Sequence, residues 1–278
     1  MPELPEVETT RRGVSPLVSG QTLSGFNIRE RRLRWPVTIP DTLVGQTLHG
    51  IRRRAKYLLF DFESGSLIIH LGMSGNLRVL PPETAYLKHD HVELLFSRGT
   101  ALRLNDPRRF GSVHWQPGDA LDHWLLTRLG IEPFDESFTG DYLKRLARKK
   151  RVAVKNFIMN AQVVVGVGNI YANEALFMAG IRPSVQASRV TRDAYGVLAE
   201  SIRQVLAEAI TMGGTTLRDF VNQNGNPGYF KQSLRVYGRQ GQPCHACGKA
   251  VSMVRLGNRA TFFCIKCQRA QGFVPPEC

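Results

Sequence analysis

The chain has 278 residues, with 37 Lys and Arg against 23 Asp and Glu, which gives a net charge of +14 and a sequence pI near 10.0. An apolar fraction of 42% supports a folded core, and no stretch reaches the roughly 18 consecutive apolar residues of a membrane helix. The first residues, MPELPEVETTRR, lack the apolar core of a secretory signal, so we expect a cytoplasmic protein with no membrane partner. The basic excess favours polyanionic partners.

The N-terminal part of the chain is predicted to begin with a short helix and to continue as strands. The apolar face of the helix, near residues 1–12, is formed by Leu4, Val7, Thr10 and Val14. Candidate strands at 56–62, 67–71, 92–96 and 101–104 are separated by Gly, Pro and Ser. This pattern predicts a β-sandwich or barrel-like domain up to about residue 116.

The next part of the chain is predicted to be helical over roughly 132–220. Within it, one helix is expected between Thr191, a candidate N-cap, and the stop signal formed by Gly213 and Gly214. A glycine-rich turn, VVVGVGN, leads into a helix expected to start near Asn169, where free N–H groups favour a phosphate. Upstream, residues 144–155 hold seven basic residues and no acid. Together these features indicate a phosphate-binding helix-turn-helix variant, although tight helix packing and a solvated basic face are the alternatives.

The cysteines are confined to the end of the chain, at Cys244, Cys247, Cys264, Cys267 and Cys278. The first four form two C-x2-C pairs separated by 16 residues, which is enough for a β-hairpin between two tight turns. Four thiolates satisfy tetrahedral Zn²⁺ and leave no open position, so we predict one structural zinc ion. Two disulfides are the alternative, and the odd cysteine count and a reducing compartment argue against them.

The predicted zinc hairpin is strongly basic. Residues 234–270 contain seven Lys and Arg and no Asp or Glu, and Arg259 lies where the hairpin tip or its return strand begins. Such a hairpin is typical of a nucleic-acid clamp. A metal-stabilised module with a solvated basic face is the alternative.

The N-terminus carries the candidate chemistry. Removal of Met1 before the small residue Pro2 exposes a prolyl amine, and an α-amino group titrates near pH 8, so much of it is neutral and nucleophilic at pH 7. Amines form Schiff bases with carbonyl carbons, and the adjacent Glu3 and the nearby Glu6 offer a general acid or base. Ordinary helix capping is the alternative for this acid-rich start.

Two loops of the β domain present bulky side chains between turn residues. They are HLGMSGN at 70–76, which contains Met73, and DPRRFG at 106–111, which contains Arg108 and Phe110. Enzymes that act on a base in a duplex extrude it and fill the gap with such side chains. The alternative places Met73 and Phe110 in the core at strand ends. Lys56, which enters an apolar strand, either snorkels to solvent or reaches a phosphate.

Seven segments of the chain, in order, resemble bacterial formamidopyrimidine-DNA glycosylases, also called 8-oxoguanine DNA glycosylase/AP lyases. They are PELPEVE, HLGMSG, KHDHV, DPRRFG, VGVGNIYANEALF, GGTTLRDF and the four-cysteine hairpin. The resemblance covers essentially the whole chain. It implies an α+β multidomain fold, with an N-terminal β-sandwich (1–131), a helix–two-turn–helix domain (132–233) and a C-terminal zinc-finger β-hairpin (234–278). It also implies binding of damaged double-stranded DNA in base excision repair. A DNA-wrapping cleft needs only one copy, so we expect a monomer.

The resemblance further implies a role for each matching residue. Pro2 matches the Schiff-base nucleophile, Glu3 the general acid, Lys56 the lysine of β-elimination, and Arg259 the arginine of δ-elimination. Met73, Arg108 and Phe110 match the side chains that replace the flipped base. The implied DNA contacts are His89, Arg108, Lys150 and Asn169, and the implied zinc ligands are Cys244, Cys247, Cys264 and Cys267. Residues near 215–230 match a loop that closes over the everted purine.

Two alternatives and two departures accompany this interpretation. A relative that prefers oxidised pyrimidines, endonuclease VIII, shares the fold but begins PEGPEI rather than PELPEVE. A non-catalytic nucleic-acid-binding protein would need no exposed Pro2 beside Glu3. The departures from the family pattern are Arg218, where a lysine is common, and the tail QGFVPPEC beyond the fourth zinc ligand.

Overall fold

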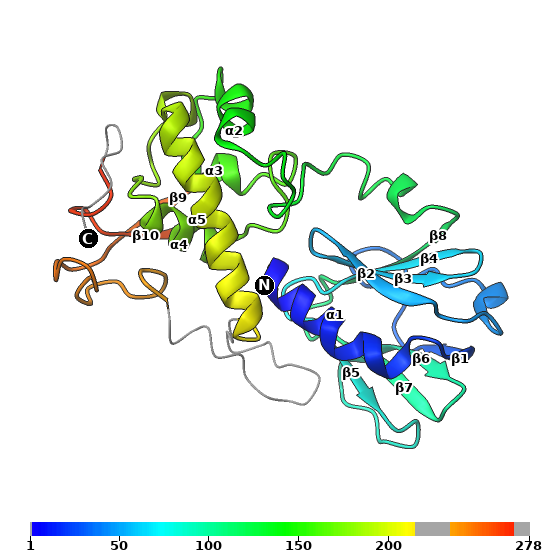
Figure 1. The fold of residues 1–278 in the computed structure, drawn as a ribbon. Coiled ribbons are helices and arrows are strands. Elements are labelled where there is room, and N and C mark those ends of the chain that lie inside the picture. Colours follow the sequence, from blue (N-terminus) through cyan, green and yellow to red (C-terminus); the bar gives the residue numbers. More distant parts are fainter. Residues whose placement is uncertain (1, 215–233, 270–278) are drawn as a thin grey trace. The chain divides into compact units, whose positions relative to one another are not determined.

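The structure is a computed structural model that describes residues 2–214 and 234–269 (Figure 1). These residues form two compact units, one of residues 2–128 with 210–214 and one of residues 129–209 with 234–269. The predicted capping loop near 215–230, Arg218, Cys278 and the C-terminal tail lie outside the described residues. The three-domain division at residues 131 and 233 stays a prediction.

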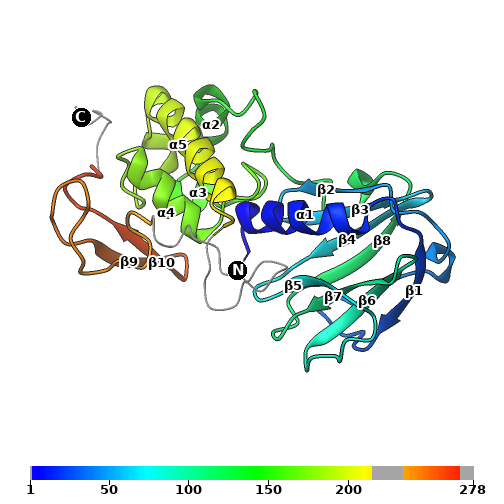
Figure 2. The same ribbon diagram turned by 60° about the horizontal axis from the view of Figure 1, so that its bottom comes forward.

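The first unit contains a helix and two antiparallel four-stranded sheets (Figures 1 and 2). One sheet has the order β1 (Leu23–Ile28), β6 (Asp90–Phe96), β7 (Thr100–Asn105) and β5 (Asn76–Leu80). The other has the order β2 (Gly50–Arg54), β3 (Tyr57–Phe62), β4 (Gly65–His70) and β8 (Ser112–Pro117). Both sheets contribute to one apolar core, so the predicted β-sandwich is confirmed.

Alternate residues of each strand build this core, because successive side chains of a strand point to opposite faces. From the two sheets, the core includes Leu58, Phe60, Leu67, Ile69, Val92, Leu94, Leu102 and Leu104. Full burial of one such side chain stabilises the fold by about 1.5–3 kcal/mol. The helix α1 (Leu4–Val18) adds Val7, Val14 and Val18 to the same core.

Helix α1 runs six residues past the predicted end at residue 12. Val14 and Val18 are both buried, so the apolar face continues for another turn. Pro16 lies inside this last turn with its ring exposed. Because proline has no backbone N–H, the helix loses one hydrogen bond there. Burial of the two valines therefore outweighs the cost of the proline.

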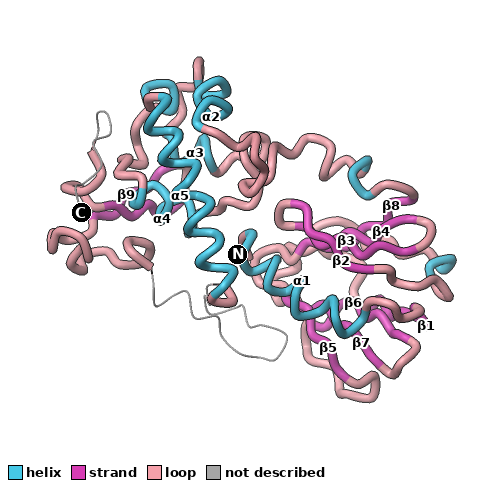
Figure 3. The backbone as a smooth tube through the Cα atoms, in the orientation of Figure 1, coloured by secondary structure: helices cyan, strands magenta, loops and turns pink. Residues whose placement is uncertain are grey.

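The second unit contains helices α2 (Gly140–Ala147), α3 (Val154–Ile158), α4 (Asn169–Met178) and α5 (Arg192–Thr211), as Figure 3 shows in cyan. Its hairpin of β9 (Ser252–Leu256) and β10 (Arg259–Phe263) lies between the two cysteine pairs, as predicted. The Thr191 hydroxyl accepts a hydrogen bond from the Ala194 N–H, which confirms the predicted N-cap. Helix α4 begins at Asn169, also as predicted. None of the described helices combines the length and the apolar character needed to cross a bilayer.

A buried ion pair fastens the loop before β6. Glu93 and Arg103 are cross-strand neighbours on β6 and β7, with 2.6 Å between Oε1 and Nε, and both side chains are almost fully buried. Arg103 also donates to the carbonyls of Pro82 and Ala85. Burial raises the pKa of Glu93, but hydrogen bonds from Tyr86, Asn27 and Arg103 outweigh it and hold the pKa below its usual value. The pair thus ties the loop that leads to His89 onto the sheet.

Replacing Arg103 with methionine is expected to lower the free energy of unfolding by about 3–5 kcal/mol, because Glu93 is left as a buried, uncompensated charge. Denaturant unfolding measures the loss, and the double variant Glu93→Gln/Arg103→Met should regain part of it. Arg98→Met, on an exposed turn of the same sheet, is the control and should change stability by no more than about 0.5 kcal/mol. A loss below about 1 kcal/mol for Arg103→Met would contradict the assigned role of the pair.

Candidate active site and metal centre

The head of α1 holds Pro2 and Glu3 in a fixed backbone. Glu3 is the N-cap, with extended backbone angles, and its N–H donates to Glu6 Oε2 at 2.8 Å. Pro2, Glu3 and Glu6 are all buried. Gly214 lies against Glu6 with a φ of +83°, and a Cβ there would stand 3.1 Å from Glu6 Oε1. The predicted nucleophile and acid therefore sit on backbone that a hydrogen bond and close packing hold in place.

Lys56 occupies a tight turn beside this helix. Arg54 and Tyr57 are paired across β2 and β3, so Ala55 and Lys56 alone form the connection. Ala55 has a φ of +56°, which L-residues other than glycine seldom adopt. Helix α1, which follows Pro2 and Glu3, packs along β2 and β3, the two strands that the turn with Lys56 connects.

The two candidate wedge loops, 70–76 and 106–111, are joined through Asp106. Its carboxylate is fully buried and accepts from the Ser74 hydroxyl at 2.8 Å and from the Gly111 N–H at 2.7 Å. Gly72 has a φ of +65° and packs so closely that a Cβ there would lie 2.4 Å from the Gly111 nitrogen. The backbones of the two loops therefore touch, and only glycine fits at position 72.

The joined loops present the three predicted wedge side chains. Arg108 is exposed, Phe110 is 42% exposed, and Met73 is partly exposed. The alternative that placed Phe110 in the core is therefore wrong. The Arg108 guanidinium lies 5.1 Å from the centre of the Phe110 ring, within range of a cation–π contact.

One histidine, His70, begins loop 70–76, and another, His89, lies next to loop 106–111. The His89 carbonyl accepts from the Asp106 N–H, which places His89 beside loop 106–111. His70 Nδ1 accepts from the Gly72 N–H at 3.0 Å. Burial lowers the pKa of His70 to about 4, and the positive charges of Lys56 and Arg34 add to the effect. His70 is thus neutral at pH 7, as its acceptor role requires. Neither Asp106 nor His70 was identified from the sequence as a functional residue, although both lie inside the quoted motifs.

Asp106→Asn is expected to loosen both wedge loops. The hydrogen bonds from Ser74 and Gly111 now use both carboxylate oxygens, and an asparagine side chain offers only one oxygen acceptor. The Gly111 amide should exchange with solvent at least about tenfold faster, in line with the 1–3 kcal/mol cost of an unsatisfied buried group. Hydrogen exchange read by NMR measures this rate. Asp119→Asn is the control, since Asp119 accepts the Leu121 N–H in an exposed turn outside both loops. Unchanged protection at Gly111 would remove Asp106 as the link between the loops.

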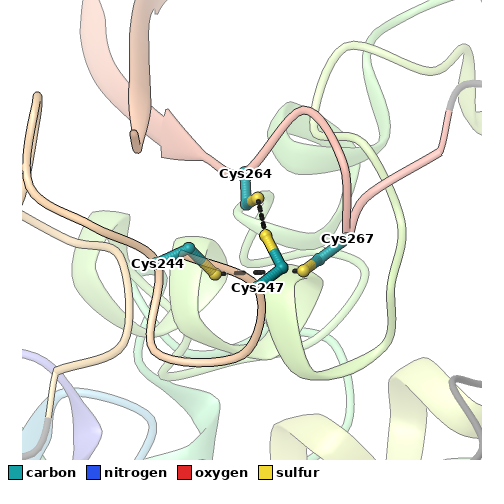
Figure 4. A group of neighbouring side chains, drawn as sticks. All are labelled: Cys244, Cys247, Cys264 and Cys267. Atoms are coloured by element: carbon teal, nitrogen blue, oxygen red, sulfur yellow. Dashed lines mark hydrogen bonds between the residues drawn. The ribbon is translucent and has the colours of Figure 1, made fainter. Parts of the chain in front are cut away.

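The four paired cysteines converge on one point (Figure 4). Their Sγ atoms all lie within 4.8 Å of one another, with 3.9 Å between Cys244 and Cys267 and 3.4 Å between Cys247 and Cys264. A Zn–S bond of about 2.3 Å gives a tetrahedron with edges of about 3.8 Å, so the donors fit one zinc ion. The sulfurs are too far apart for disulfides, and the disulfide alternative is wrong.

Buried polar groups of the helices hold the zinc hairpin. Lys155 is fully buried, and its Nζ donates to the Ala260 carbonyl at 3.0 Å and to the Thr261 hydroxyl at 2.7 Å. The Asn169 amide donates to the same Ala260 carbonyl, and Asn173 accepts the Phe262 N–H. These contacts fix the start of β10, directly after Arg259.

Glu174 anchors the chain before the first cysteine pair. Its buried carboxylate accepts the N–H groups of Arg235, Val236 and Tyr237 at 2.7–3.0 Å. Burial raises the pKa of Glu174, and these three donors only partly oppose the shift. Sequence analysis missed Asn173 and Glu174, and it assigned Lys155 to a basic run on the surface. A polar residue on an otherwise apolar helix face was the available signal for the two on α4.

The remaining predicted contacts lie on the surface of the second unit. Arg259 is the exposed first residue of β10, and Lys150 is exposed between α2 and α3. Gly166, in the turn before α4, has a φ of +82°. The Asn169 amide binds the carbonyl of Ala260, so Asn169 lies at the start of β10 beside Arg259. Residues 148–151 of the basic run are solvent-facing, as a phosphate-binding surface requires.

Loss of one zinc ligand is expected to release the metal. Cys264→Ser should lose its zinc at a chelator concentration at which the unmodified protein retains one ion per chain, because structural zinc binding is part of the folding free energy. Metal analysis after dialysis against the chelator measures this difference. Cys278→Ser is the matched control and should keep one zinc ion. Full zinc retention by Cys264→Ser would show that the four cysteines are not the ligand set.

Three protein-family models match successive parts of the chain. The Formamidopyrimidine-DNA glycosylase N-terminal domain matches residues 1–113, the Formamidopyrimidine-DNA glycosylase H2TH domain matches 129–221, and a zinc finger found in FPG and IleRS matches 241–270. A Formamidopyrimidine-DNA glycosylase of Alkalilimnicola ehrlichii is 55% identical over 277 residues, which is 97% of this chain and 100% of the relative. One of Thioalkalivibrio sulfidiphilus is 56% identical over 271 residues, with the same coverage.

Solved structures resemble the fold over nearly the whole chain. The complex between a Lactococcus lactis FPG mutant and a Fapy-dG containing DNA has a TM-score of 0.89 at 32% identity, and covers 96% of this chain and 100% of that one. The MutM (FPG) protein from Thermus thermophilus has a TM-score of 0.87 at 38% identity, and covers 96% of this chain and 98% of that one.

Proposed function

Because the chain belongs to the formamidopyrimidine-DNA glycosylase family, we propose that it excises oxidised purines from duplex DNA and then cuts the strand as an AP lyase. Its substrates in this proposal are 8-oxoguanine and ring-opened formamidopyrimidines. The observation that carries the mechanism is the arrangement at the head of α1, where Pro2 and Glu3 stand on a backbone held by Glu6.

In the proposed reaction, the Pro2 amine attacks C1′ of the damaged nucleotide. The bond from C1′ to the base nitrogen breaks, and the base leaves with a proton. Glu3 acts as the general acid that assists this cleavage and the opening of the sugar ring. The product is an iminium between Pro2 and C1′, which makes the neighbouring C2′ proton acidic.

Two eliminations follow in this proposal. Lys56 serves proton transfer as the C2′ proton is removed and the 3′ phosphate departs. Arg259 serves the second elimination, in which the 5′ phosphate departs and a one-nucleotide gap remains. A cationic side chain beside each departing phosphate stabilises the charge that develops on it.

The other predicted residues bind and open the duplex. Met73, Arg108 and Phe110 fill the space of the everted base, which the exposure of Arg108 and Phe110 on joined loops supports. His89, Lys150 and Asn169 contact the DNA, and we expect affinity to fall steeply with salt. Cys244, Cys247, Cys264 and Cys267 hold the zinc ion, which stabilises the hairpin that carries Arg259 and takes no part in bond breaking.

The proposal includes a monomer that works in the cytoplasm. Every residue assigned a role lies on one chain, so no second copy is needed. A zinc site made only of thiolates is typical of a reducing compartment. Analytical ultracentrifugation tests the oligomeric state. We expect one copy of the chain in the free protein and one copy per lesion duplex in the DNA complex.

Borohydride trapping tests the nucleophile. The processed protein, mixed with an 8-oxoguanine duplex and borohydride, is expected to form a covalent complex, because hydride reduces the iminium to a stable amine. A form that retains Met1 has Pro2 in a peptide bond, so it should give a trapped yield at least about a hundredfold lower. Gel electrophoresis under denaturing conditions measures both yields.

The control for this experiment is an undamaged duplex, which should not be trapped by either form. A duplex with an oxidised pyrimidine tests the endonuclease VIII-like alternative, and preferential trapping there would replace the purine assignment. Equal trapping by the form that retains Met1 would move the nucleophile away from Pro2. Absence of trapping and of incision by the processed form would favour the non-catalytic alternative.

A further inference from the structure

The carboxylate of Glu8 gathers three arginines beside α1. Its Oε1 accepts from Arg11 and Arg12, each at 2.8 Å, and its Oε2 accepts from Arg11 at 3.1 Å and from Arg53 at 3.2 Å. The Glu8 and Arg53 side chains are only 10% and 13% exposed. Arg53 is on β2, so this ion pair crosses from helix α1, which follows Pro2 and Glu3, to the neighbouring sheet.

Arg53 continues the connection into the turn that carries Lys56. Its Nη1 donates to the Ala55 carbonyl at 3.0 Å, and that carbonyl belongs to the peptide bond that joins Ala55 to Lys56. A guanidinium held by a carboxylate at Nε and by a carbonyl at Nη1 has little freedom to turn. Arg53 therefore restrains the peptide plane from which the Lys56 side chain starts.

The turn needs this restraint because its backbone is strained. Ala55 is buried and adopts a φ of +56°, a backbone conformation that is unfavourable for an alanine. The turn lacks a glycine or asparagine at this position, which are the residues that usually adopt such a conformation. Contacts around the turn must hold it, and strain of this kind gathers at functional sites.

We propose that Glu8 and Arg53 are positioning residues for the strand-cutting step, because together they fix Lys56 relative to helix α1, which directly follows Pro2 and Glu3. This inference rests on the proposed function, in which Lys56 serves β-elimination. The side chains do not touch the DNA in this proposal. They hold the Lys56 amine at a fixed position, because a group that transfers the C2′ proton must lie within hydrogen-bond distance of it.

Arg12 provides a matched comparison. It binds the same Glu8 carboxylate, but it is 59% exposed and its ion pair stays within the helix, four residues from Glu8. If Arg53 acted only by neutralising Glu8, Arg12, which binds the same carboxylate, would share that role. A role in positioning Lys56 makes only Arg53 important for elimination.

The experiment separates imine formation from strand cutting on an abasic-site duplex with enzyme in excess. Borohydride trapping counts the molecules that form the imine, and the single-turnover incision rate is measured for that fraction, so misfolded molecules do not contribute. Arg53→Met is expected to trap within twofold of the unmodified protein and to incise about 10- to 100-fold more slowly, the range that a displacement of about 1 Å produces. Arg12→Met should incise within twofold of the unmodified protein.

A double-mutant cycle identifies the residue through which Arg53 acts. In a Lys56→Met background, Arg53→Met should slow incision no further, since the lysine it positions is gone. Glu8→Gln, which keeps the shape of the side chain, should show the same split between trapping and incision with a smaller loss. It serves as the second variant if Arg53→Met accumulates poorly.

Three results would overturn the inference. They are normal incision by both Arg53→Met and Glu8→Gln, an equal loss for Arg12→Met, or a further loss of the same size in the Lys56→Met background. Failure of the proposed function looks different, because the unmodified protein would then trap no abasic DNA at all.

Discussion

The hydrogen bond from the Glu3 N–H to the Glu6 carboxylate is the contact on which the proposed chemistry depends most. A side-chain nucleophile can be oriented by its rotamer, but an N-terminal amine follows its backbone alone. Helix α1 supplies that backbone, and Val7, Val14 and Val18 fix the helix in the core of the sandwich. The apolar core thus holds the helix that directly follows Pro2 and Glu3 in place.

Buried polar groups perform the same task elsewhere in the molecule. Asp106 joins the two loops that carry the wedge side chains, Lys155 fixes the start of β10, and Glu174 anchors the chain before the first cysteine pair. Each of these groups is buried and makes its hydrogen bonds to backbone or hydroxyl groups. A buried group of this kind favours one local geometry over alternatives that would leave it without partners. Arg108, Phe110 and Arg259, which are assigned to DNA, lie on segments that Asp106 and Lys155 hold in place.

Periodicity and spacing predicted β3, β4, β6 and β7 of the sandwich but did not single out β1, β2, β5 and β8. Contacts distant in the chain account for part of what they missed. The strands near 56–62 and 92–96, the start of α4 at Asn169 and the cysteine hairpin all follow from local patterns. The end of α1 did not, because burial of Val18 carries the helix past residue 12 and through Pro16. Lys155 is separated by 106 residues from the Thr261 hydroxyl it binds, so a run of basic residues gave no sign that one of them is buried. Asp106 was read as part of a motif, and only the fold reveals that it ties two loops together.

The most direct test of the account is to locate the DNA adduct. Processed protein is reduced with borohydride while it acts on an 8-oxoguanine duplex, the DNA is digested, and the peptides are analysed by mass spectrometry. The account predicts a sugar remnant on the peptide that begins at Pro2, attached at its amine nitrogen. A remnant on Lys56 or any other lysine, with the N-terminal peptide unmodified, would contradict it.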